Sequence, residues 1–245
     1  MTTVREYNSY GQQLEEMLLL KTAPLAVRML EKGEDVPEGA IRPKKDRGIH
    51  ISQCQAFAMS RRDRLTVAML TEDHWCFAPL IGYGHVDKPD DPQIERFLQF
   101  PRFERGQYVG IVSAPLRLAN FAPDLVMIYS NTAQLRNLLW PSEVMGRPVR
   151  ISSSFYPPSC VYSVVPVLRD HECVVTLPDP GDYVRALAGE DEIIFSLPPD
   201  TIGDLVANLE PVKQMGVGFE TQRMHPDFER PDFYVRLFEE WGLDT

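Results

Sequence analysis

Sulfur and imidazole side chains that could bind a metal are concentrated between His50 and Gly84. This stretch holds two of the four cysteines, Cys54 and Cys76, together with His74, and His85 follows directly after it. Thiolate sulfur binds iron–sulfur clusters, and zinc accepts both thiolate and imidazole. We therefore expect this stretch to form the first part of a metal or iron–sulfur site, completed by a cysteine far along the chain.

An internal repeat indicates which cysteine completes the site. When Cys160 is placed under Cys54 without gaps, the segment 66–73 aligns with the segment 172–179. In both copies a strand after Ala-Pro precedes a cysteine that opens a short helix, and a second strand follows. The alignment makes Cys54 and Cys160 equivalent, whereas Cys173 falls inside a strand as a core thiol. Chance similarity between two common strand–helix–strand units is the alternative.

Cys54, Cys76 and Cys160 are therefore the predicted ligands of a [4Fe–4S] cluster. The N–H groups at a helix N-terminus stabilise negative charge, so we expect them to lower the pKa of a thiol placed there. Three cysteines would leave one iron open to a small polar metabolite, as redox or lyase-type chemistry requires. Redox chemistry would also need an electron-transfer partner. Whether the protein is an enzyme stays open at this point.

Three other uses of these residues remain open. The cysteines could be buried structural thiols in a metal-free protein that binds a small molecule or a partner. A mixed set of cysteine and histidine could bind zinc. Cys54 could also act as a nucleophile activated by His50 or His74. The candidate substrate contacts are Tyr83, His85 and Arg117, and the Gly-Tyr-Gly run at 82–84 is either a site of close approach to a ligand or a plain turn.

The composition restricts the classes of partner. The chain has 245 residues, of which 44% are hydrophobic and 24% charged, with a formal net charge of −10. This acidic balance argues against nucleic acid, because phosphate binding needs a basic face. No apolar stretch approaches the roughly 18 residues of a membrane span, and the first residues do not resemble a signal peptide. We expect a cytoplasmic protein whose four cysteines are not a disulfide framework.

The alternation of strand and helix patterns predicts an α/β or α+β fold with a mixed sheet and flanking helices. We expect one domain over residues 1–245, with a duplicated core at about 22–80 and 121–182 and a C-terminal helical extension. That last helix could be a homodimer contact or could cover its own core. The predicted helices are 4–20, 54–60, 92–100, 131–138, 159–167, 201–209 and one from 231, and the strands are 25–30, 65–70, 108–113, 125–130, 173–177 and 192–197.

Several short motifs occur in an order that resembles a known family. They are Tyr-Gly-x-x-Leu at 10–14, Leu-Lys-x-x-Pro-Leu-Ala-Val at 20–27, Cys-Gln-Ala at 54–56, Cys76, Ala-Pro-Leu at 114–116 and Pro-Asp at 123–124. Over about residues 7–210 the chain resembles the family called domain of unknown function 169 (DUF169). The resemblance implies an origin among archaea and anaerobic bacteria, which is compatible with an oxygen-sensitive cluster, and it implies no substrate. Ala78-Pro79 stands where the family pattern has a glycine.

Overall fold

A single seven-stranded sheet organises the protein. The computed structural model describes residues 2–91, 95, 98–144, 151–154, 157–214 and 230–243. Strand order is β2-β3-β1-β4-β7-β6-β5, and neighbours are antiparallel except for the parallel pair β5 and β6. The predicted mixed sheet with flanking helices is therefore confirmed. The strands are β1 Leu25–Leu30, β2 Val67–Leu70, β3 Gly110–Pro115, β4 Leu125–Ser130, β5 Ile151–Ser154, β6 Cys173–Thr176 and β7 Ile193–Leu197.

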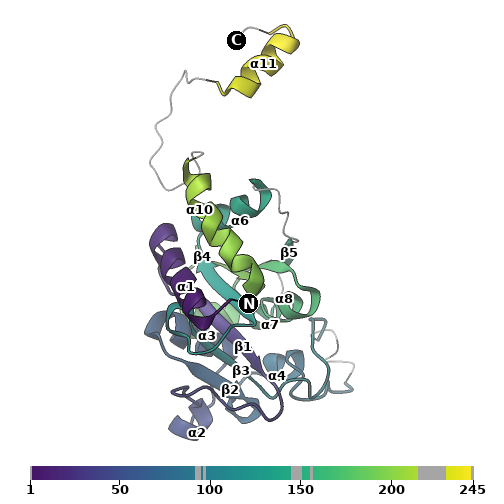
Figure 1. Ribbon diagram of the computed structural model, residues 1–245. Coiled ribbons are helices and arrows are strands. Elements are labelled where there is room, and N and C mark those ends of the chain that lie inside the picture. The colour runs from purple at the N-terminus through teal and green to yellow at the C-terminus, as the bar shows by residue number, and fades with distance from the viewer. Residues whose placement is uncertain are drawn as a thin grey trace.

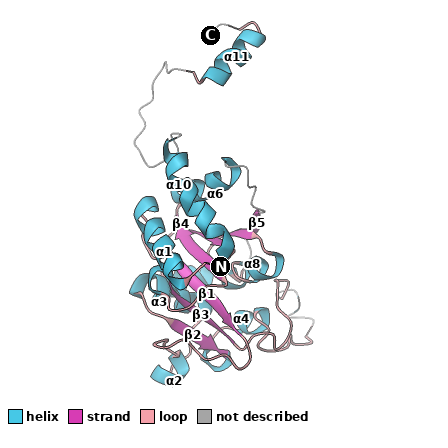
Figure 2. Ribbon diagram, viewed as in Figure 1, coloured by secondary structure: helices cyan, strands magenta, loops and turns pink. Residues whose placement is uncertain are grey.

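Helices cover both faces of this sheet (Figures 1 and 2). Within the described residues, no helix is both long and apolar enough to cross a membrane. The helices are α1 Val4–Leu18, α2 Pro43–Arg47, α3 Gln53–Asp63, α4 Phe77–Gly82, α6 Thr132–Val144, α7 Ser159–Tyr162, α8 Val165–Asp170, α9 Pro180–Ala186, α10 Ile202–Gln214 and α11 Asp232–Glu240, with short 3-10 turns η1 Thr71–Asp73, η2 Leu116–Leu118 and η3 Pro199–Thr201.

The central strands are buried on both sides. In β1, Leu25 and Val27 join a core with residues of α3, α4 and α7, whereas Ala26 and Leu30 join a second core with residues of α1 and α10. All six residues of β4 are buried. A strand covered on both faces needs apolar side chains at every position, so its sequence is a continuous hydrophobic run. This is why β1 and β4 were predicted with their observed bounds.

The order of the strands is the same in the two halves of the sheet. Reading outward from the central antiparallel pair β1 and β4, one half runs β1-β3-β2 and the other β4-β7-β6. Along the chain, β1-α3-β2-α4-β3 corresponds to β4-α7-β6-α9-β7. Cys54 and Cys160 are thus the second residues of equivalent helices. That the halves arose by duplication remains a prediction.

Local capping signals were accurate, whereas internal prolines were misleading. Ser52 caps α3 as expected, and Thr3 and Glu6 form the predicted capping box of α1. The helix predicted to end at residue 209 instead runs through Pro211 to Gln214, because Val212 is buried and this burial outweighs one lost hydrogen bond. The predicted end of α6 at residue 138 was wrong in the same way.

Other boundaries were shifted or missed. Strand β3 begins two residues later than predicted, and the expected loop after Cys76 is helix α4. Helix α9 and strand β5 were not predicted. The predicted helix 92–100 includes positions 92–94 and 96–97, which lie outside the described residues.

A buried ion pair joins the two halves. Arg61, near the end of α3, donates hydrogen bonds of 2.8 and 3.0 Å to the carboxylate of Glu192, which directly precedes β7. Their side chains are 1% and 4% exposed. The guanidinium also lies 3.9 Å from the ring centre of Tyr129 in β4. The helix that carries Cys54 is therefore held against strands of the other half.

Replacing Arg61 by Met is expected to lower the free energy of unfolding by about 3–5 kcal/mol, because Glu192 would remain as an unpaired buried charge. The double variant Arg61→Met/Glu192→Leu should recover most of this loss, since no charge stays buried. Urea unfolding followed by circular dichroism measures both variants.

Lys21→Met is the matched control, because Lys21 and Asp191 form an ion pair of 2.7 Å whose side chains are 60% and 55% exposed. Its effect on stability should be much smaller. If Arg61→Met and Lys21→Met were equally stable, the buried pair between Arg61 and Glu192 would not hold the two halves of the sheet together.

Candidate functional site

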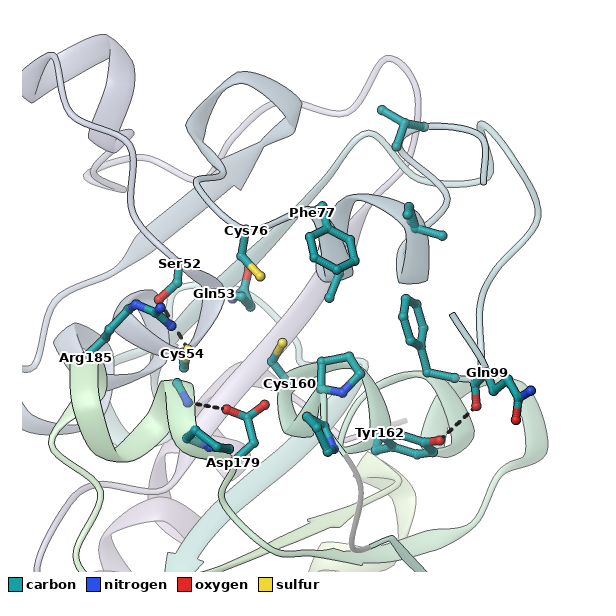
Figure 3. A pocket seen from close by; sticks show the side chains of 18 of the residues that line it. Ser52, Gln53, Cys54, Cys76, Phe77, Gln99, Cys160, Tyr162, Asp179 and Arg185 are labelled. Carbon is teal, nitrogen blue, oxygen red and sulfur yellow. Dashed lines mark hydrogen bonds between the residues drawn. The ribbon is translucent and has the colours of Figure 1, made fainter. Parts of the chain in front are cut away.

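The first residues of four helices surround one cavity of about 1330 Å³ (Figure 3). Helix α3 contributes Ser52–Cys54, α4 contributes Cys76–Ala78, α7 contributes Cys160 and α9 contributes Asp179–Gly181. These helices belong to both halves of the sheet, so the cavity lies between the halves. The topology described above thus explains why segments far apart in the sequence meet here.

The three cysteines predicted as ligands all line this cavity. Cys54 and Cys160 are 7% and 6% exposed, and Cys76 is half-buried. Figure 3 shows the sulfurs of Cys76 and Cys160 turned toward the same space, with Cys54 beside it. The fourth cysteine, Cys173, lies in β6 and belongs to the core on the opposite face of the sheet. The structure therefore separates three cavity thiols from one core thiol.

Burial raises the pKa values of two of the cavity thiols, Cys54 and Cys160, in the metal-free protein. Desolvation, assisted by the negative charge of Asp182, raises the pKa of Cys54 to about 12. Desolvation and the neighbouring Cys54 raise the pKa of Cys160 well above its ordinary value. The expectation that helix N-termini lower these pKa values was wrong, because α7 has only four residues and burial dominates. A protonated thiol is a poor nucleophile, so the geometry does not favour Cys54 as one.

Asp179 fixes the helices that surround the cavity. One carboxylate oxygen accepts a hydrogen bond of 2.9 Å from the backbone N–H of Ser159, and the other accepts bonds of 2.6 and 3.3 Å from Gly181 and Asp182. The same side chain thus caps both α7 and α9. Asp179 and Cys76 are the N-cap residues of the equivalent helices α9 and α4. The site has a carboxylate in one half where it has a sulfur in the other.

The predicted substrate contacts lie outside the cavity lining. Tyr83 is fully buried, and its hydroxyl donates a 2.7 Å hydrogen bond to the backbone carbonyl of Cys160. His85 is buried with its ring centre 5.5 Å from that of His74. Arg117 lies in η2, with its Nη1 3.9 Å from a carboxylate oxygen of Glu15 on α1. The structure does not bring these three residues together, and their roles as substrate contacts stay predictions.

The buried histidine pair is neutral. Desolvation lowers the pKa of His74 to about 3 and that of His85 to about 4. No hydrogen-bond partner for any of the four ring nitrogens occurs in the described part of the chain. His50, by contrast, is exposed.

A single metal ion needs ligands that converge on one point. Among the residues that the structure describes, no three Cys, His, Asp or Glu side chains do so. The zinc alternative would require such a group. In an iron–sulfur cluster each cysteine binds a separate iron, so its ligands need not converge on one centre.

Sequence reasoning missed Gln53, Asp179 and Arg185, which also line the cavity. Asp179 could have been found, because Asp179, Pro180 and Asp182 form a capping box with proline at the first helical position. Gln53 and Arg185 carry no signal of their own, because only the meeting of α3 and α9 brings them to one cavity.

Comparison with known proteins identifies the family. The model of the family DUF169, described as "Uncharacterised ArCR", matches residues 13–208. The chain belongs to this family. An uncharacterized protein of Methanocaldococcus jannaschii, MJ0308, is 22% identical in an alignment of 231 residues that covers 86% of this chain and 97% of that relative. No solved structure matches the chain. All four cysteines lie within the DUF169 match.

In this member of the DUF169 family, the Gly-Tyr-Gly run packs against the chain itself. A Cβ atom on Gly82 would lie 2.7 Å from both methyl groups of Val161 in α7. Gly84 has φ +72°, and a Cβ there would lie 2.3 Å from the carbonyl oxygen of Glu104. Gly82 therefore permits the contact between α4 and α7 that brings Cys76 near Cys160.

Alanine at position 82 is expected to lower the free energy of unfolding by about 1–3 kcal/mol, because its methyl group would overlap Val161. This sign is opposite to the usual gain when glycine in a helix is replaced by alanine. Urea unfolding of Gly82→Ala, Val161→Ala and the double variant tests the overlap. The double variant should be more stable than the sum of the two single effects predicts, and strict additivity would contradict the contact.

Proposed function

We propose that Cys54, Cys76 and Cys160 hold a [4Fe–4S] cluster whose fourth iron is open to a small polar metabolite. The observation that carries the proposal is that three cysteines from distant segments line one cavity, whereas Cys173 does not. Buried free thiols are common. Three of them on one wall, each beside the first residue of a different helix, form a ligand set of the kind that clusters use.

The surroundings of the thiols also support a cluster. The cavity is large enough for a cluster together with a second small molecule, and much of its wall is apolar, which protects a cluster from water. Burial disfavours free thiolates here, and bound iron supplies the positive charge that makes them favourable.

The proposed chemistry is that of an iron without a cysteine ligand that faces a largely apolar cavity. The open iron would act as a Lewis acid on an oxygen or sulfur atom of the metabolite, in a lyase-type or redox reaction. Redox use would add an electron-transfer partner. The cytoplasmic location and the homodimer expected from the sequence belong to the same proposal.

A metal-free binding protein is the second candidate. The observation in its favour is that burial raises the pKa values of Cys54 and Cys160 and that the cavity wall is largely apolar, as in many small-molecule sites. In that case the cysteines would serve only as small apolar side chains.

Anaerobic purification followed by iron and sulfide analysis separates the two candidates. The cluster predicts brown protein with about four iron and four sulfide per chain and a broad absorbance near 400 nm. Brief exposure to air should give a paramagnetic three-iron form, because the iron without a cysteine ligand leaves first. Colourless protein without iron after anaerobic reconstitution would overturn the cluster.

Single substitutions of the cysteines by alanine test the ligand set. Cys54→Ala, Cys76→Ala and Cys160→Ala should each lose at least half of the bound iron, whereas Cys173→Ala should keep all of it. Cys173 is the matched control because it is equally buried and lies on the other face of the sheet. A Cys160→Ala variant with full iron content would refute this trio.

A further inference from the structure

Gln53 presents an unpaired polar group to the cavity. Its side chain is almost fully buried, and its amide oxygen has no hydrogen-bond partner in the part of the chain that the structure describes. Gln53 also lines the cavity beside the thiols (Figure 3). A buried acceptor without a partner costs free energy that a bound donor would recover. A hydroxyl or N–H group of a molecule bound in the cavity, brought next to Gln53, would supply the missing partner.

Arg185 places a positive charge at the same end of the cavity. A Cβ atom built on Gly181 would lie 3.3 Å from Nη1 of Arg185 and 3.4 Å from Sγ of Cys54. Arg185 is a solvent-exposed residue. Its guanidinium and the thiol of Cys54 both border the position above Gly181, together with a carboxylate oxygen of Asp179 at 2.9 Å. The guanidinium also stacks on Trp75, with 4.6 Å between its carbon and the ring centre. This stacking orients its N–H donors, which match a carboxylate.

The other residues of the lining indicate the charge of the bound anion and the polarity of the rest of the molecule. Among the described residues, Arg185 is the one cationic side chain of the lining, and Asp87 and Asp179 oppose it. A multiply charged anion would be repelled by the two carboxylates, so the balance favours a single negative charge. The lining also includes Phe77, Ile81 and Phe100, which suit an apolar body.

We propose that the cavity binds an apolar monocarboxylate that carries a hydroxyl or amino group, with Arg185 on the carboxylate and Gln53 on the donor. The inference rests on the proposed function for one point, namely that the donor-bearing carbon lies beside the open iron. Binding of the carboxylate and of the donor group depends only on the side chains of Arg185 and Gln53, so it can be measured in the metal-free protein.

Two dyes that differ in one group test the arginine. Anilinonaphthalene sulfonate is a fluorescent monoanion, and N-phenyl-1-naphthylamine has the same rings without the sulfonate. In the metal-free full chain, Arg185→Gln should weaken binding of the sulfonate dye about tenfold, as expected for loss of a hydrogen bond to a charged group. Binding of the neutral dye should not change, and Arg185→Lys should restore part of the sulfonate affinity.

Arg64→Gln is the matched control, because Arg64 pairs with Glu15 and is not part of the cavity lining. It should leave the affinity for both dyes unchanged. If Arg185→Gln lowered the affinity for both dyes equally, or lowered neither, the anion site would be overturned. Circular dichroism of each variant verifies that it is folded.

Competition by two fatty acids tests Gln53. 2-Hydroxyoctanoate should displace the sulfonate dye about fivefold better than octanoate, as one additional neutral hydrogen bond predicts. In Gln53→Leu this preference should vanish while octanoate competes as before. A preference that survives in Gln53→Leu would overturn the donor assignment.

These binding results and the iron analysis are independent. If Arg185→Gln and Gln53→Leu left dye binding and the preference for the hydroxy acid unchanged, while the protein still bound four irons, only the proposed ligand class would be refuted. Normal recognition in a protein that takes up no iron would refute only the cluster.

Discussion

The buried ion pair between Arg61 and Glu192 is the constraint on which the site depends. It connects the end of α3 to the residue before β7, so it crosses from one half of the sheet to the other. The cavity lies where the halves meet, and α3 carries Cys54 as its second residue and Arg61 in its last turn. Taking two charges out of water is costly, and the two hydrogen bonds together with Tyr129 offset this cost only in one geometry. The pair therefore specifies how the halves dock as well as contributing to stability.

The same docking explains the state of the thiols. Apolar packing between α4 and α7 through Gly82 and Val161 brings Cys76 near Cys160 and removes water from around them. The exclusion of water that suits a cluster also raises the pKa values of Cys54 and Cys160 when no metal is present. Metal binding would thus release protons from the site. A cavity that excludes water raises the pKa of a thiol, so it cannot also supply a low-pKa thiol without a positive charge.

The sequence was informative wherever a local signal decided the structure. Continuous apolar runs gave β1 and β4 with their observed bounds, and capping residues gave the starts of α1 and α3. The cysteines of the cavity were found because the repeat made Cys54 and Cys160 equivalent. Arg185 was missed, since its place in the cavity depends on which helices pack together over long sequence separations. Pro211 shows the same limit, because tertiary burial overrode a strong local preference.

The pairing of Cys76 with Asp179 gives the cavity a direction. Two identical halves would create a site that looks the same from either side, and a bound molecule would have two equivalent ways to lie in it. Here the N-cap position is sulfur in α4 and carboxylate in α9, and Arg185 follows only in α9. A molecule bound there would therefore meet different partners at its two ends, so the two-fold order of the strands is not carried over into the cavity.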